Sequence, residues 1–128
     1  MRTIRSRILE LAQLKQGWLD GHEGEPLPRS GLTWLEEQLT RACVAGMPMP
    51  WIYATADGNV QLEWRFGTWS PSLEINTLHR LGQFHTCDVA STDGDHDERS
   101  FDDIDLHEPE GWELVAEELE QDRKAAGL

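Results

Sequence analysis

A hairpin signal in the middle of the chain constrains the fold more than any other feature. Asp57-Gly58 stands between two runs rich in aromatic and branched residues, 51–56 and 59–66. Asp-Gly is one of the pairs that tight β-hairpin turns prefer, because the glycine adopts a positive φ without strain. The chain therefore contains at least one antiparallel strand pair.

The register of this hairpin has two solutions. A two-residue turn places Val60 beside Thr55. A type I turn followed by Gly58 in the left-handed conformation places Val60 beside Ala54, and we favour this second register. Because side chains alternate along a strand, Val60 and Leu62 share one face in either case.

Two further strands are expected, over 72–77 and over 83–90. Connections this short favour antiparallel pairing, since parallel strands need longer crossovers. Residues 92–99 read as a polar loop and 101–106 as a short extended piece. The sequence thus predicts a four-stranded antiparallel meander.

Amphipathic spacing predicts three helices around this sheet. Apolar residues recur at three- and four-residue intervals over 3–16, over 30–45 and after Pro109, with a Gly- and Pro-rich loop at 17–30. The sheet face under the helices should carry Val60, Leu62, Trp64, Leu73 and Ile75. The predicted fold is α+β in one domain, 1–128, with two N-terminal helices, a four-stranded antiparallel meander and a C-terminal helix packed on one sheet face.

Charge is distributed unevenly along the chain, whose net charge is −13. Residues 1–87 carry a net charge of −1 and residues 88–128 a net charge of −12. A field of that sign repels phosphate, so no nucleic acid is expected as a partner, whereas a basic protein is a candidate partner for residues 88–128. The chain shows neither a signal peptide nor a membrane span, so we expect no membrane partner and a cytoplasmic location.

Motifs for metals and cofactors do not occur in the sequence. The five histidines show no ligand pairing, and Cys43 and Cys87 form no CxxC motif and read as free thiols. The segment 93–97 resembles the start of a calcium loop, but Glu98 stands where that loop needs glycine. We therefore predict no metal and no cofactor.

Polar residues of the strands form the first candidate site. On the sheet face away from the helices, the meander would gather Glu63, Glu74 and His85, and two carboxylates beside a histidine could act as acid, base or ligand. The other ligand-binding candidates on this face are Gln61, Arg65 and Asn76. The alternative is an ordinary solvated face on which Glu63 pairs with Arg65 or Arg80.

The loop at 18–25 is the second candidate site. It gathers an aromatic residue, acids, a histidine and glycines, and its ligand-binding candidates are Trp18 and Asp20. The alternative interpretation is structural. Trp18 would then anchor the loop, and Asp20 would bond nearby backbone amides in an Asx-type turn.

Two segments together resemble a family of small uncharacterised bacterial proteins. Trp18-Leu19-Asp20-Gly21 is similar to that family's Trp-Asp-Gly loop, and residues 55–64, Thr-Ala-Asp-Gly-Asn-Val-Gln-Leu-Glu-Trp, are similar to its Thr-Pro-Asp-Gly-Gly-Val-x-Leu-Glu-Trp hairpin. Leu73-Glu74-Ile75 resembles its Leu-Glu-Ile strand. This chain departs from the pattern by its Leu19, by Ala56 in place of Pro and by Asn59 in place of the second Gly. The resemblance implies an accessory protein of the kind carried on mobile elements such as integron gene cassettes, and it implies no activity.

Three functions compete at this point. The first is an acidic accessory binding protein that self-associates as a homodimer, because some aromatic residues exceed what a small core needs, namely Trp51, Tyr53, Phe66 and Trp69. The second is a small enzyme, such as a metal-assisted hydrolase, that uses Glu63, Glu74 and His85. The third is an acidic decoy, meaning an antitoxin, immunity or DNA-mimic protein that occupies a basic partner through residues 88–128.

Overall fold

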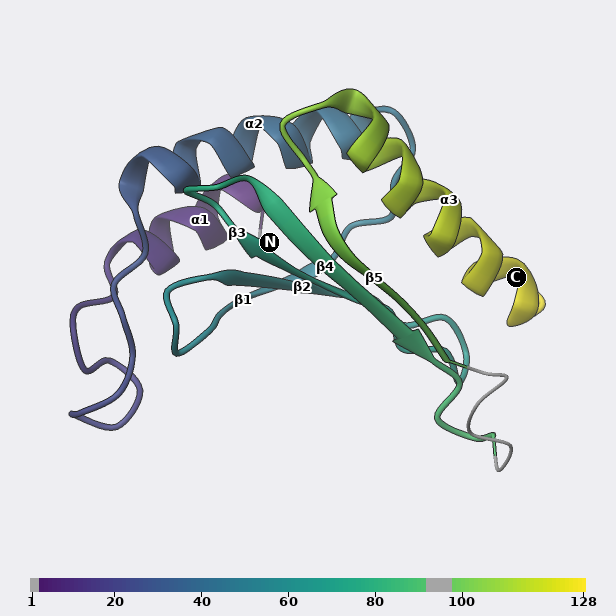
Figure 1. The fold of residues 1–128 in the computed structure, drawn as a ribbon, viewed down its shortest axis with the longest axis horizontal. Helices are drawn as coiled ribbons and strands as arrows, with labels where there is room; N and C mark the ends of the chain where they lie inside the picture. Colours follow the sequence, from purple (N-terminus) through teal and green to yellow (C-terminus); the bar gives the residue numbers. More distant parts are fainter. Residues whose placement is uncertain (1–2, 92–97) are drawn as a thin grey trace.

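The structure is a computed structural model that describes residues 3–91 and 98–128. Within these residues, five strands form one antiparallel sheet in the order β1-β2-β3-β4-β5. The strands are β1 (Trp51–Ala54), β2 (Val60–Glu63), β3 (Ser72–Asn76), β4 (Leu81–Cys87) and β5 (Glu98–Asp105). The helices of the same described residues, α1 (Ile4–Ala12), α2 (Arg29–Val44) and α3 (Pro109–Ala125), lie along one side of the twisted sheet (Figure 1). The α+β class and the antiparallel meander are confirmed, and the predicted four strands are corrected to five.

The hairpin at Asp57-Gly58 has the favoured register. Ala54 pairs with Val60, and Gly58 has a φ of 83°. The N–H of Gly58 donates to the carbonyl oxygen of Thr55 at 3.1 Å. A type I turn followed by a left-handed glycine matches the twist of the two strands. The register places Val60 and Leu62 toward the helices, and both are fully buried.

Side chains from both layers meet in a single core. The strands contribute Val60, Leu62, Leu73, Ile75 and Phe84, and the helices contribute Ile8, Leu11, Leu32, Leu35, Leu39, Val115 and Leu119. None of these residues is more than 5 % exposed. In a core packed this closely, truncating one large side chain to Ala costs about 2–5 kcal/mol.

Strand β5 lies where the sequence predicts a polar loop followed by a short extended piece. Arg99 and Phe101 pair with inward-facing residues of β4, but the register then shifts, so that the next buried residue is Ile104. Asp103 has a φ of 53° at this irregularity. A bulge breaks the two-residue alternation by which a strand is recognised, and an inward arginine hides it further. The predicted loop residues 92–97 lie outside the described residues.

Helix α1 is shorter than the predicted range 3–16. Thr3 and Ser6 form a capping box, in which the N–H of Ser6 donates to Thr3 Oγ1 at 3.0 Å and the N–H of Thr3 donates to Ser6 Oγ at 2.9 Å. The helix ends at Ala12. Lys15, the next position of the apolar stripe, is exposed, so a further turn would bury no apolar surface. Helix α2 begins and ends within one residue of the predicted 30–45.

Candidate functional site

The sheet face that the helices leave uncovered, here called the open face, carries most of the candidate residues. Strand pairing arranges its side chains in rows across the sheet. Glu63, Ser72 and His85 occupy one row, and Gln61 and Glu74 lie in the next. Neighbouring strands are about 4.8 Å apart, so Glu63 and His85 are separated by roughly 9.6 Å of sheet. The structure places Glu63, Glu74 and His85 on one face, as predicted. Glu74, however, lies in a different row from the other two, and Glu63 and His85 are two strands apart.

Each of these three side chains bonds to a different neighbour. The bonds are Gln61 Nε2 to Glu63 Oε1 at 2.9 Å, Asn59 Nδ2 to Glu74 Oε2 at 2.9 Å, and a 2.7 Å contact between His85 Nε2 and Glu98 Oε1. Within residues 3–91 and 98–128, no three His, Cys, Asp or Glu side chains are grouped so that they could hold a metal ion. The acidic pair with an adjacent histidine that the enzyme hypothesis requires is not assembled on this face.

Asn76 and Arg65 lie at opposite ends of the open face. Asn76 Oδ1 accepts hydrogen bonds from the N–H groups of Leu78 and His79 at 3.1 and 3.0 Å, so this side chain stabilises the turn between β3 and β4. Arg65 is exposed, and its Nε donates to the carbonyl oxygen of Gly67 at 3.2 Å. The amide of Asn76 is therefore engaged by the backbone, whereas most of the Arg65 guanidinium faces solvent.

The loop at 18–25 has the internal bonds that the structural interpretation predicts. Trp18 Nε1 donates to the carbonyl oxygen of Glu25 at 2.8 Å. Asp20 Oδ1 accepts from the N–H groups of Glu23 and His22 at 2.5 and 2.8 Å, and these bonds lower the pKa of the Asp20 carboxyl. Both candidate side chains hold the loop in shape, and a ligand-binding role for them stays a prediction.

Two aromatic side chains of β1 form a ridge at the β1 edge of the open face, where Trp51 pairs with Glu63 and Tyr53 with Gln61. Trp51 is 60 % exposed and Tyr53 is 42 % exposed. The other two aromatic residues expected at the surface pack inward instead: Phe66 is 8 % exposed, and Trp69 is partly buried against the core. The expected surplus of aromatic surface is therefore concentrated at Trp51 and Tyr53.

A hollow lies on either side of this ridge, and Trp51 and Tyr53 line both. The first, here called the edge groove, has a volume of about 370 Å³, and its other lining residues are Thr3, Arg7, Met49, Pro50 and Ile52. The second, here called the face hollow, has a volume of about 470 Å³, and it is also lined by Gln61, Glu63, Arg65, Ser72, His85 and Cys87. The face hollow thus contains four of the predicted site residues, Gln61, Glu63, Arg65 and His85.

Arg7 covers the free edge of the sheet beside the edge groove. Within the described residues, β1 pairs with β2 alone, so alternate backbone groups of β1 point away from the sheet. Arg7 Nε donates to the carbonyl oxygen of Ile52 at 2.6 Å, and the guanidinium carbon lies 5.9 Å from the centre of the Tyr53 ring. This side chain occupies the position at which another strand would bind, which protects the edge from β-pairing.

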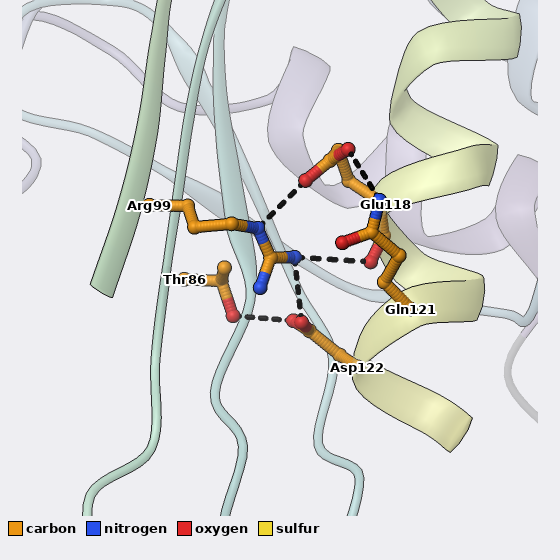
Figure 2. A network of polar contacts seen from close by, with 5 residues as sticks. All are labelled: Thr86, Arg99, Glu118, Gln121 and Asp122. Atoms are coloured by element: carbon orange, nitrogen blue, oxygen red, sulfur yellow. Dashed lines mark hydrogen bonds and ion pairs between the residues drawn. The ribbon is translucent and has the colours of Figure 1, made fainter. Parts of the chain in front are cut away.

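A buried polar network, which the sequence patterns did not predict, connects α3 to strands β4 and β5 (Figure 2). Arg99 Nε donates to Glu118 Oε1 at 2.7 Å, and its terminal nitrogen donates to Asp122 Oδ1 at 2.7 Å. The hydroxyl of Thr86 donates to the other oxygen of Asp122, and Gln121 Nε2 donates to Glu118 Oε2 at 3.2 Å. Asp122 has no exposed surface, so the network satisfies a carboxylate that water does not reach.

The guanidinium of Arg99 is held from several sides. Its central carbon lies 5.6 Å from the centre of the Trp69 ring. Burial by itself lowers the pKa of Arg99, but the hydrogen bonds and negative charges of Asp122 and Glu118 together raise it. The sequence contained one signal of this network. Glu118 and Asp122 are four residues apart and share the helix face of Val115, where polar residues are unusual. Because these groups bond to one another, we assign the network to holding α3 in place.

Comparison with known proteins finds no relative for this chain: no family model, no curated protein and no solved structure matches it. In the described ranges 3–91 and 98–128, no helix is both long and apolar enough to cross a bilayer. The two hollows beside the ridge are therefore interpreted from their own side chains.

Proposed function

We propose that this chain is an acidic accessory interaction protein that self-associates as a homodimer through the ridge and the edge groove. The observation that supports this proposal is a 60 % exposed Trp51 directly beside a mostly apolar groove of about 370 Å³. A projection and a groove side by side on one surface are self-complementary, because a two-fold axis brings Trp51 of each copy to the groove of the other. Trp, Tyr and Met are also enriched at the centres of protein interfaces.

The distribution of charge favours a second copy at this end of the molecule. Residues 88–128 carry a net charge of −12 out of −13, and the described part of that segment forms β5 and α3, with β5 at the opposite edge of the sheet from β1. Contact through β1 keeps the two acidic regions apart. Repulsion between charges separated by more than about 8 Å is largely screened at physiological salt.

The contact we propose is made by side chains and not by sheet extension. Arg7 already bonds to the outward carbonyl oxygen of Ile52, and Pro50 has no N–H to donate at the start of the strand. The two sheets would therefore meet at their aromatic ridges without becoming one continuous sheet.

Sedimentation velocity over about 1 µM to 1 mM tests this proposal. Replacing Trp51 by Ser should weaken dimerisation by about 30-fold, since a central tryptophan typically contributes about 2 kcal/mol or more. The matched control is Leu78→Ser, which removes a residue that is 63 % exposed in the turn after β3, and it should leave the dissociation constant unchanged.

Two results would contradict the proposal. One is a particle of 14.6 kDa at every concentration. The other is a dimer that Trp51→Ser leaves intact. The acidic-decoy hypothesis has a separate test: binding of this chain to a basic protein should weaken steeply with salt, because charge-driven contacts are screened by ions.

A further inference from the structure

The face hollow contains two opposite charges that are not paired with each other. Glu63 and Arg65 are two residues apart on the same side of the chain, at a backbone separation of about 7 Å. Among the ion pairs of the described residues, Glu63 pairs with neither Arg65 nor Arg80, so these predicted pairs are not formed. Gln61 bonds to one oxygen of Glu63, and Gly67 accepts from the Nε of Arg65. This leaves Glu63 Oε2 and both terminal amino groups of Arg65 for a ligand.

We propose that the face hollow binds a free α-amino acid with an apolar or aromatic side chain. In this arrangement the α-ammonium donates to Glu63 Oε2, and the α-carboxylate accepts from the terminal amino groups of Arg65. Both contacts are charge-assisted hydrogen bonds, which are the stronger kind. The side chain of the amino acid packs against the ring of Trp51, which the strand register places directly opposite Glu63.

The charges of the hollow select a zwitterion over a singly charged ligand. An anion that paired with Arg65 would approach the carboxylate of Glu63, and a cation that paired with Glu63 would approach Arg65. An α-amino acid offers one group of each sign, joined through a single carbon, so it satisfies both neighbours at once. The volume of about 470 Å³ lies within the range of roughly 300–1,000 Å³ that small-molecule sites occupy.

This site shares Trp51 and Tyr53 with the proposed dimer contact, because both residues line both hollows. The edge groove and the face hollow lie on opposite flanks of the ridge, and the charged groups that recognise the amino acid line the face hollow alone. Binding is therefore expected of the monomer, whose Trp51 is free to pack against the ligand, so that failure of the dimer proposal leaves this one standing.

The test is a titration of the full chain with L-phenylalanine, followed by the ¹H–¹⁵N correlation spectrum at a protein concentration where sedimentation shows a single species. We expect saturable shifts of the Trp51 indole N–H and of the amides of 61–65, with a dissociation constant of about 1 mM or below. Glu63→Gln should weaken binding by about tenfold or more, since it removes one charge-assisted bond. The matched control Glu74→Gln changes a carboxylate on the same face that bonds to Asn59, and it should leave binding unchanged.

Two analogues separate the contributions of the ligand's charges. N-acetyl-L-phenylalanine lacks the ammonium and L-phenylalaninamide lacks the carboxylate, and each should bind at least about tenfold more weakly than phenylalanine. The proposal is overturned if phenylalanine produces no saturable shifts. It is equally overturned if both analogues bind as tightly as phenylalanine, or if Glu63→Gln and Glu74→Gln have the same effect.

Discussion

Replacing Arg99 by Leu removes the cation of the buried network. Asp122 has a side chain with no exposed surface, and that of Glu118 is 8 % exposed, so neither carboxylate can be hydrated without displacing α3. The hydroxyl of Thr86 and the amide of Gln121 would remain as their hydrogen-bond donors. No other Lys or Arg forms an ion pair with these two carboxylates in the part of the chain that the structure describes.

The stability that Arg99→Leu should lose follows from the burial of the two carboxylates. Removing one partner of a buried ion pair typically costs about 3–5 kcal/mol, because the other charge is left without compensation. The Arg99 side chain is 28 % exposed, so water already screens part of its interaction, and we expect about 3 kcal/mol. A domain of this size is stable by only about 5–15 kcal/mol, so the loss is a large fraction of the total.

Urea denaturation followed by circular dichroism measures the loss of unfolding free energy. The slopes of the transitions are compared as well, because midpoints report stability only when the slopes agree. Arg123→Leu is the matched control, because Arg123 pairs with Glu120 on the exposed side of the same helix and should leave the midpoint nearly unchanged. The triple variant Arg99→Leu, Glu118→Leu, Asp122→Leu removes all the charges of the network and should recover most of the lost stability. Equal midpoints for Arg99→Leu and Arg123→Leu would refute the assignment of the network to α3 attachment.

Three further predictions concern single positions. Gly31→Ala should destabilise the fold by about 1–3 kcal/mol, because the new Cβ would lie 2.1 Å from Thr77 Oγ1 and 2.5 Å from Thr77 Cβ. Urea midpoints should show only partial recovery when Thr77→Ala is added, since that change removes Oγ1 and keeps Cβ. Gly111→Ala should lower the free energy of unfolding at least as much, because the new Cβ would lie 2.0 Å from the backbone oxygen of Asp105. Since the clash is with backbone, no second side-chain substitution should restore the urea midpoint. Backbone hydrogen bonds lower the pKa of Asp20 in the folded chain below 3.8, so its contribution to stability is present above that value and is lost as the pH falls through the folded pKa. The difference in thermal midpoint between the parent chain and Asp20→Asn should therefore shrink steadily as the pH falls below 3.8 through the folded pKa, and a difference that stays constant over this acid range would contradict this.

The hairpin and the inward residues of β2 and β3 could be predicted because short-range rules determine them. Asp57-Gly58 specifies a turn, and strict alternation then assigns Val60 and Leu62 to one face and Glu63 to the other. Buried and half-buried residues alternate without exception along β2 and β3. Long-range information was not needed for this part of the fold.

Strand β5 could not be predicted from the same rules. Its inward position at Arg99 is polar, and the bulge near Asp103 shifts the later inward residue to Ile104. Only the partner helix explains why an arginine is tolerated there, since Glu118 and Asp122 lie far away in the sequence. Such a pairing is a property of the assembled layers and not of the local pattern.

The sequence could predict which sheet face carries the candidate residues, but not which of them lie next to one another. Alternation along β2 and β3 places Glu63 and Glu74 on the open face, as the structure has them. The pattern over 83–90 alternates only weakly, so the place of His85 on this face follows from its pairing with Ser72 in the structure. Which side chains share a row across the sheet depends on the register between neighbouring strands. The side chain that contacts His85 is Glu98, which belongs to the unpredicted strand β5. The side chains that line the face hollow, including Arg65 beside the unpaired Glu63, could be identified only after the strands were placed.

A dilution series of ¹H–¹⁵N spectra tests most directly whether the β1 end of the sheet is the surface through which this chain associates. Amide signals of Met49, Trp51, Ile52 and Tyr53 and the side-chain signal of Arg7 should shift as the concentration rises, while the amide signals of α3 (Pro109–Ala125) stay fixed. Spectra that do not change with concentration, or changes confined to β5 and α3, would contradict it.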